Sequence, residues 1–339
     1  MHPLTARLRS TRFHSLGEHY FEVFQPQGLR NPEVIEIDDD TASSLGVPTD
    51  DLAGEELVSM FSGNRVPPQC TPIAQDYAGH QFGSFNPFLG DGRAVILGDV
   101  DTDEGIMEIS LKGIGSTPYG RDHDGKAGVS ECVLEFSTAK RLRELAVPTA
   151  RCLCVVAGEE LVYRGGFERT AVLVRVSPTH VRIGTFENYY FQRDSEALQR
   201  LADYVIQHHF GQNQQSGSIS CAAFFERVVT QSAELFAHWQ ANGFVHGMLN
   251  TDNHLVLGIS FDLGESGFTL EREPDFVANS ADEQGRYAFG QQPVIGLWNL
   301  NVLGRALSPL VDAADIRAAL SQYESAYLDH LSVLESDRA

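Results

Sequence analysis

The sequence changes from strand-like to helix-like patterning near residue 187, and this change limits the folds open to the chain. Before it, segments such as "MEISLKG" (107–113) and "TAVLVRVS" (170–177) are short and apolar or alternating, and glycines separate them, as in β-strands joined by turns. After it, "CAAFFERVVTQSAELFAHWQANG" (221–243) has apolar residues at helical spacing. The pattern predicts an α+β protein with a strand-rich N-terminal part, residues 1–186, and a helical C-terminal part, residues 187–339.

Glycines and apolar spacing also locate individual elements. Residues 33–70 are predicted to form a strand, a helix and a connecting segment, and the glycine-rich stretch 80–121 to form hairpins, with "LGDGRA" (89–94) as a turn. Residues 129–146 have helical spacing with Pro148 just beyond them, and residues 313–334 have the same spacing. Each is therefore predicted to be a single amphipathic helix.

Composition excludes several classes of partner. The 339 residues contain 42% hydrophobic residues, enough for a packed core, and the net charge of −21 opposes binding to a phosphate backbone. The longest apolar stretches are strand-sized, and no apolar signal sequence follows Met1. The five cysteines form no C-x-x-C pair, so buried reduced thiols are favoured over a zinc site. We expect a cytoplasmic monomer without nucleic-acid or membrane partners.

The stretch "VHGMLNTDN" (245–253) resembles the catalytic loop of a protein kinase without its catalytic residue. Kinases have H-R-D-x-x-x-x-N, in which the Asp accepts the proton of the substrate hydroxyl and the Asn binds magnesium. Here His246 and Asn253 keep the interval, but Met248 occupies the Asp position. Methionine cannot accept a proton, so an ordinary protein kinase is disfavoured.

Other residues follow the kinase order around this loop. Gly90 and Gly92 allow backbone N–H groups to approach phosphate and Arg93 adds a charge, although an ordinary turn explains the same residues. Lys112 ends a predicted strand on the face opposite Met107, Ile109 and Leu111, and Glu135 lies on the next predicted helix. The two would form the Lys–Glu pair of kinases, whereas each alone would be a solvated side chain.

Candidate metal and phosphate ligands complete the set. "DLG" at 262–264 resembles the kinase D-F-G, and Asp262 with Asn253 would offer hard oxygen ligands suited to Mg²⁺ or Mn²⁺. Arg175 and Arg182 in "VLVRVSPTHVRIG" could bind phosphate or form structural salt bridges. Both alternatives are left open at this point.

Several long blocks then resemble the selenoprotein O family of pseudokinase-like proteins. They are "DYAGHQFGSFNPFLGDGRAVILGD", "LKGIGSTPYGRDHDGKA", "RVSPTHVRIGTFE", "HGMLNTDN", "DLGESGF" and "GRYAFGQQPVIGLWNLNVL". The resemblance implies a two-lobed protein-kinase fold with its nucleotide-binding lobe over 1–186. It also implies ATP as co-substrate and transfer of AMP, rather than the γ-phosphoryl group, to Ser, Thr or Tyr side chains of other proteins.

The resemblance also assigns roles to residues of this chain. Asp252 would accept the proton, Glu135 would pair with Lys112, and Asn253 and Asp262 would bind the metal. Attack at the α-phosphorus requires basic groups on the β and γ phosphates, which leave as pyrophosphate. The implied ATP-binding residues are Gly90, Gly92, Arg93, Lys112, Asp124, Gly125, Arg175, Arg182 and Asp262.

The chain departs from the family pattern in three places. Phe85, Asn86 and Pro87 replace the usual Trp and Ala-Gly, and His123 replaces a Gly before Asp124. The chain also stops at Ala339, short of the C-terminal region and the Cys or selenocysteine motif of many members, so redox control through that motif is not expected. The alternative function is therefore a catalytically inactive ATP-binding pseudokinase that acts by binding.

Overall fold

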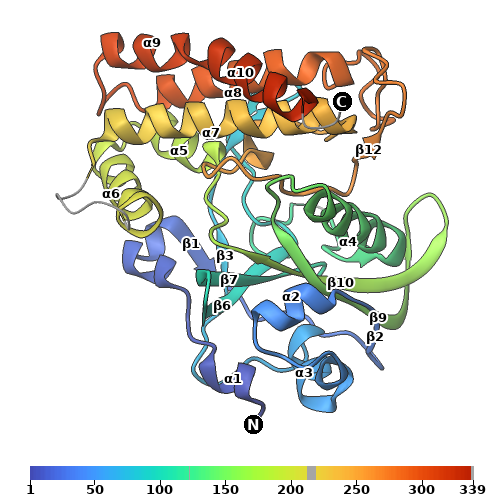
Figure 1. The fold of residues 1–339 in the computed structure, drawn as a ribbon. Helices are drawn as coiled ribbons and strands as arrows, with labels where there is room; N and C mark the ends of the chain where they lie inside the picture. Colours follow the sequence, from blue (N-terminus) through green and yellow to red (C-terminus); the bar gives the residue numbers. More distant parts are fainter. Residues whose placement is uncertain (122, 212–218, 337–339) are drawn as a thin grey trace. The chain divides into compact units, whose positions relative to one another are not determined.

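The computed structural model describes residues 1–121, 123–211 and 219–336, and it divides into two compact units (Figure 1). Unit 1 contains residues 1–76, 88–141 and 150–180, and unit 2 contains residues 77–87, 142–149 and 181–339. Both combine helices and strands, so the protein is a mixed α/β protein, and its large antiparallel sheet lies entirely in unit 1.

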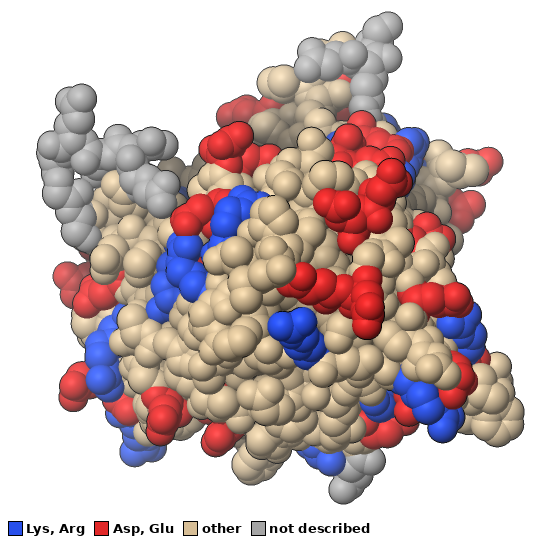
Figure 2. Space-filling model, turned by 90° about the horizontal axis from the view of Figure 1, so that it is seen from below, with Lys and Arg blue, Asp and Glu red and all other residues tan. Residues whose placement is uncertain are grey.

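Charged side chains of both signs lie on the face of the protein drawn in Figure 2. On the face drawn in Figure 2, Asp and Glu side chains lie among Lys and Arg side chains, in keeping with the net charge of −21. Within the ranges that the structure describes, no helix combines the length and apolar character needed to cross a membrane.

The sheet of unit 1 has eight strands, all paired antiparallel, in the order β1-β3-β6-β7-β10-β9-β2 with β8 beside β10. Two hairpins, β6–β7 and β9–β10, provide its centre, and the strand-like segments that the sequence predicts fall in them. The strands are β1 (Phe21–Val23), β2 (Glu33–Ile37), β3 (Ile73–Gln75), β6 (Ala94–Thr102), β7 (Gly105–Lys112), β8 (Ala127–Gly128), β9 (Arg151–Tyr163) and β10 (Phe167–Ser177).

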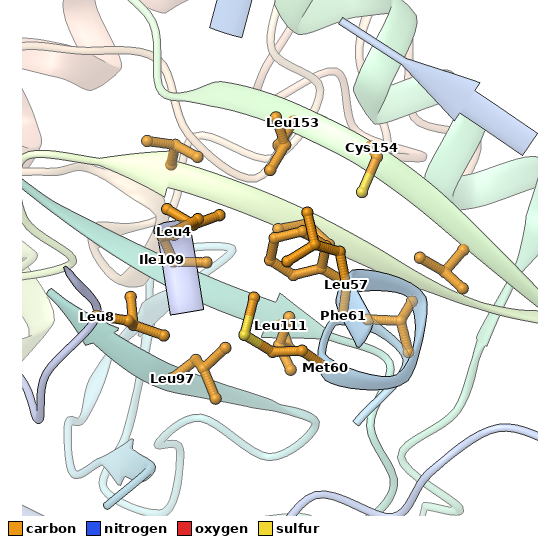
Figure 3. Close-up of a cluster of buried hydrophobic side chains, with 14 of the residues drawn as sticks. Leu4, Leu8, Leu57, Met60, Phe61, Leu97, Ile109, Leu111, Leu153 and Cys154 are labelled. Carbon is orange, nitrogen blue, oxygen red and sulfur yellow. The ribbon is translucent and has the colours of Figure 1, made fainter. Parts of the chain in front are cut away.

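One face of this sheet packs on short helices and forms an apolar core. Figure 3 shows Leu57, Met60 and Phe61 of α3 (Glu55–Phe61) against Leu111 of β7 and Leu97 of β6. These side chains are at most 1% exposed. Two more short helices, α1 (Pro3–Arg7) and α2 (Asp39–Ser44), contribute to the same core. The segment 33–70, for which one helix is predicted, therefore contains two, α2 and α3.

The opposite face of β7 is polar but not solvated. Glu108, Ser110 and Lys112 alternate with the apolar residues as the sequence predicts, yet all three are buried, with Lys112 only 4% exposed. Helix α4 (Val129–Glu144) reaches this face, because Glu135 contacts Lys112. A solvated strand lysine, one of the two readings of Lys112, is therefore wrong.

Unit 2 is built around the long helix α7, which packs against α8, α9 and α10 (Figure 1). Ser220 caps its start by accepting the Ala223 N–H at 3.2 Å, and Gly243 ends it with a left-handed φ of 65°. The helices are α5 (Ile183–Phe191), α6 (Ser195–Val205), α7 (Cys221–Asn242), α8 (Gln292–Ala306), α9 (Ala313–Ser321) and α10 (Tyr323–Ser336). Two small hairpins join them, β4 (Gly79–Gln81) with β5 (Ser84–Asn86) and β11 (Phe244–Val245) with β12 (Gly267–Phe268).

Two further predicted elements differ from the structure. Residues 313–334 form two helices that separate at Gln322. The stretch 89–94 is a loop that enters β6, not a hairpin turn, because β6 pairs with β3 and β7 instead. The five cysteines are free, and all but the half-buried Cys221 are buried.

Candidate functional site

In unit 1, the Lys112 ammonium is held by two glutamates of α4. Its Nζ donates to Glu135 Oε2 at 2.8 Å and lies 2.9 Å from Glu131 Oε1. The two glutamates are four residues apart and so share one face of the helix. The predicted Lys–Glu pair is therefore present in space, and Glu131 is an additional partner.

Two arginines extend this pair into a network. Arg175 Nε donates to Glu135 Oε1 at 2.6 Å, and Arg93 uses both terminal nitrogens on Glu131, at 2.9 and 2.5 Å. Arg175 faces Ser110 across β7 and β10, which makes it a diagonal neighbour of Lys112 on the same face. The two carboxylates thus hold three cationic side chains, Lys112, Arg93 and Arg175, in one network.

The network sets the ionisation of Glu131. Burial raises the pKa of Glu131, but Lys112 and Arg93 outweigh it and lower this pKa to about 2. Glu131 therefore stays negative at neutral pH and holds Lys112 and Arg93 together. Arg175 is in a buried ion pair in this structure, so its structural and phosphate-binding roles are not exclusive alternatives.

Gly90 and Gly125 are required by the packing of their own chain, and Gly92 is closely packed. A Cβ on Gly90, whose φ is 88°, would lie 2.5 Å from the ring of Tyr119, and one on Gly92 would lie 3.1 Å from the Tyr119 carbonyl oxygen. Gly125, with φ 68°, would place a Cβ 2.1 Å from the carbonyl carbon of Gly115. Because Gly90 and Gly125 need glycine without a ligand, the glycines alone do not identify a phosphate loop.

Asp124 has partners other than the Lys112 network. Its Oδ1 accepts from Arg164 at 2.6 Å and from the Lys126 backbone N–H at 2.9 Å. Burial raises the pKa of Asp124, but Arg164 and the Lys126 N–H together outweigh it and the pKa is lowered. The structure thus brings Lys112, Glu135, Arg93 and Arg175 together and leaves Asp124 in a separate, exposed pair.

In unit 2, the loop that resembles a kinase catalytic loop is fixed by its own histidine. The Nδ1 of His246 accepts the Met248 N–H at 3.3 Å, so Nε2 carries the proton and donates to the Phe261 carbonyl at 2.8 Å. The Asn253 side-chain nitrogen donates to the Met248 carbonyl at 3.0 Å. This bond leaves the amide oxygen of Asn253 as the atom with metal-binding capacity.

Asp252 is buried beside this asparagine with half of its hydrogen-bonding capacity unused. Its Oδ2 accepts from the side chain of Gln81 in β4 at 3.0 Å, and its Oδ1 has no hydrogen-bonding partner. Burial raises the pKa of Asp252 to about 6, despite the hydrogen bond from Gln81. A carboxylate with this pKa and one free oxygen is chemically suited to accept a proton near neutral pH.

Arg182 belongs to unit 2 and lies near the same loop. Its guanidinium stacks 4.1 Å from the centre of the Tyr77 ring, and its Nη1 donates to the Asp252 carbonyl at 3.3 Å. Unlike Arg175, it is therefore grouped with Asp252. Asp262 has a left-handed φ of 58°, which is uncommon for a residue other than glycine.

The donor set of this loop fits a hard divalent cation. Asn253 and Asp262 offer amide and carboxylate oxygens, and the Oδ1 of Asp252 is an unpartnered buried oxygen next to Asn253. Among the described residues, however, no group of three or more His, Cys, Asp or Glu side chains could hold a metal ion by itself. A cation bound here would need further oxygens from water or from a nucleotide.

Two residues of these sites are absent from the sequence-based set. Glu131 lies one helical turn before Glu135, and this spacing was the available signal for it. Gln81, which holds Asp252, lies 171 residues away in the chain and carries no local signal.

These observations define a mixed α/β protein with a buried Lys–Glu pair and a kinase-like His–Asn loop in which methionine replaces the catalytic aspartate. The chain belongs to the family described as "Protein adenylyltransferase SelO", which matches residues 3–338. It is similar to the protein nucleotidyltransferase YdiU of Aliivibrio salmonicida (strain LFI1238), with 44% identity over 316 residues, 93% of this chain and 65% of the relative. It is also similar to the protein of the same name from Vibrio cholerae serotype O1, with 42% identity over 326 residues, 96% of this chain and 66% of the relative. The chain thus spans about two thirds of the length of these relatives.

Proposed function

We propose that this chain transfers AMP from ATP to a Ser, Thr or Tyr hydroxyl of a protein, in a reaction that requires Mg²⁺ or Mn²⁺. The observation that carries the proposal is the state of Asp252, which is buried, has one free oxygen and has a pKa of about 6, while Met248 fills the kinase base position. Membership of the adenylyltransferase family and the names of the relatives support the same reaction.

We further propose a protein-kinase-like two-lobed fold, with residues 1–186 as the nucleotide-binding lobe and 187–339 as the helical lobe. The position of the large sheet in unit 1 and of α5 to α10 in unit 2 supports this division. Lys112, Arg93 and Arg175 would bind the phosphates of ATP, with Glu135 and Glu131 holding them in place. Gly90, Gly92, Asp124, Gly125 and Arg182 remain proposed nucleotide contacts.

In the proposed reaction, the hydroxyl oxygen of the acceptor attacks the α-phosphorus of ATP. The bond between this phosphorus and the bridging oxygen to the β-phosphorus breaks, and pyrophosphate leaves with the bonding electrons. Asp252 accepts the hydroxyl proton, and the cations of unit 1 stabilise the charge that develops on the leaving group. Asn253 and Asp262 would hold the divalent cation, which supplies additional charge neutralisation to the phosphates when bound.

Labelled ATP distinguishes this proposal from its alternatives. The protein is incubated with Mg²⁺ or Mn²⁺ and with ATP labelled either at the α or at the γ phosphate, and protein-bound label is measured. We expect only the α label to enter protein, and Asp252→Asn to abolish this transfer while ATP still binds. Incorporation of the γ label would indicate a kinase, and ATP binding without either label would indicate the inactive pseudokinase.

A further inference from the structure

A cavity of about 220 Å³ lies in unit 2, outside the residues assigned to ATP and metal. It is formed by residues of β4, α5 and α8, and the residues that matter here are His80, Glu187, Phe191, Trp298, Asn301 and Arg305. The cavity combines one buried carboxylate with several aromatic rings.

Glu187 is the polar centre of this cavity. It is 0% exposed, and its Oε1 bonds to Nδ1 of His80, while its Oε2 has no hydrogen-bonding partner. A buried carboxylate oxygen without a partner is costly, and such groups normally bind a donor. The carboxylate therefore lacks one donor that a ligand could supply.

Aromatic side chains line the cavity beside Glu187. The Trp298 ring lies 5.2 Å from the His80 ring in an edge-on arrangement, and the Phe191 ring lies 6.3 Å from it. The exposed Arg305 already places its guanidinium 5.9 Å from the ring centres of Tyr190 and Phe191. Aromatic faces attract cations, and the Trp298 ring likewise has a guanidinium, that of Arg286, 4.8 Å from its centre.

Strand β4 contacts both the cavity and the candidate proton acceptor. In β4, the side chain of His80 bonds to Glu187, and that of the next residue, Gln81, bonds to Asp252. The His80 backbone N–H donates to the Thr251 hydroxyl at 2.7 Å, which fixes the strand to the loop that carries Asp252. Both Glu187 and Asp252 are therefore held by side chains of the same short strand.

We propose that this cavity binds a lysine or arginine side chain of the protein that receives AMP, close in sequence to the acceptor hydroxyl. The inference rests on the proposed function, which supplies a protein as substrate. The unpartnered carboxylate oxygen, the aromatic rings and the net charge of −21 all favour a cation. A second cavity of about 390 Å³ shares Tyr190, Phe191 and Arg305 with the first, so the depression suits an extended segment rather than a compact small molecule.

Peptide binding can be measured without activity, because Trp298 lines the cavity and Trp239, the second of the two tryptophans, is buried. The probes are acetylated, amidated heptapeptides with a central Ser, Thr or Tyr and one flanking residue set to Lys, Ala or Glu at each position in turn. We expect a lysine peptide to change the tryptophan fluorescence with at least tenfold higher affinity than its alanine counterpart. Glu187→Gln should remove this preference, and the exposed Glu196→Gln should keep it.

Transfer of the α label to the same peptides gives the second readout. Glu187→Gln should lower kcat/KM for the lysine peptide at least tenfold and leave the alanine peptide unchanged, which a general folding defect would not do. Trp298→Leu is a second variant that weakens the same preference without altering His80 and Glu187. Equal affinity for the three peptides would overturn the inference, and tighter binding of the glutamate peptide would overturn it in favour of Arg305 as the ligand-binding group. A lysine preference in binding with no label transferred would instead contradict the proposed function alone.

Discussion

The Nε2 atom of His246 lies 2.8 Å from the carbonyl oxygen of Phe261, the residue before Asp262. The side chains of His246 and Phe261 are buried, and the centre of the His246 ring lies 5.3 Å from the centre of the Trp239 ring. One neutral imidazole thus ties the start of the loop 246–253 to the segment that presents Asp262. The histidine keeps a positioning role although the kinase aspartate two residues later is replaced by Met248.

Replacing His246 by alanine should therefore weaken unit 2 and its ligand binding together. The change leaves the Phe261 carbonyl and the Met248 N–H without their partner and opens a cavity, and we expect a loss of about 2–4 kcal/mol in the free energy of unfolding. Both tryptophans, Trp239 and Trp298, lie in unit 2, so urea unfolding followed by their fluorescence reports on this unit. The exposed His19→Ala serves as control, and an unchanged midpoint for His246→Ala would contradict the role.

The Lys112 network should show strong coupling between its members. In Lys112→Met, Glu131 still contacts Arg93 and Glu135 still contacts Arg175, so each of the two carboxylates keeps one cation. We expect a destabilisation of about 1–3 kcal/mol, smaller than the loss of an isolated buried pair, together with a loss of AMP transfer.

A double-mutant cycle of Lys112→Met and Glu131→Gln measures this coupling. Unfolding is followed by circular dichroism, because unit 1 contains no tryptophan. The two changes together should cost at least 1 kcal/mol less than the sum of the single changes. Lys140→Ala, on the exposed side of α4, is the matched control. Additive effects would mean that Glu131 does not hold Lys112.

The sequence predicted the elements that carry local signals and missed features that depend on distant contacts. Order and spacing were sufficient to pair Lys112 with Glu135, because a strand and the following helix are adjacent in the chain. A hairpin turn at 89–94 was predicted because Asp91-Gly92 suits one. In the structure, β6 pairs instead with β3, and a pairing with a strand so far back along the chain leaves no local signal in the sequence. The break at Gln322 has no glycine or proline to mark it, and the hydrogen bond from Gln81 to Asp252 depends on the tertiary fold.

Asp99 should make the stability of unit 1 depend on pH. It faces Glu108 across β6 and β7, is 0% exposed, and burial together with the Glu108 charge raises its pKa from 3.8 to about 6. A raised pKa means that the folded state binds the proton more tightly, so this contribution to stability is present below about pH 4 and is lost as the pH rises through 6. Two pKa units correspond to about 3 kcal/mol.

Asp99→Asn removes this dependence, because asparagine is neutral at every pH and can still accept the Arg12 backbone N–H that Asp99 accepts at 2.9 Å. Between pH 4.5 and 7.5, we expect the variant to gain about 2 kcal/mol relative to the unsubstituted protein in urea unfolding followed by circular dichroism. The raised pKa of Asp99 would be contradicted if the difference in free energy of unfolding between the two proteins stayed constant over this range, or if it changed in favour of the unsubstituted protein as the pH rises.

Two substitutions of Asp262 separate the effect of its charge from the effect of its backbone conformation. Its left-handed φ of 58° is tolerated by aspartate and asparagine better than by alanine. Asp262→Asn and Asp262→Ala both remove the negative charge, so both should weaken Mg²⁺-dependent ATP binding at least tenfold in calorimetric titration. Only Asp262→Ala should in addition lower the free energy of unfolding of unit 2, by about 1 kcal/mol.

The exposed Asp275→Asn controls for loss of a negative charge. If Asp262→Asn bound ATP with Mg²⁺ as tightly as the unsubstituted protein, Asp262 would not be a metal ligand, and a loss confined to Asp262→Ala would assign its effect to the backbone.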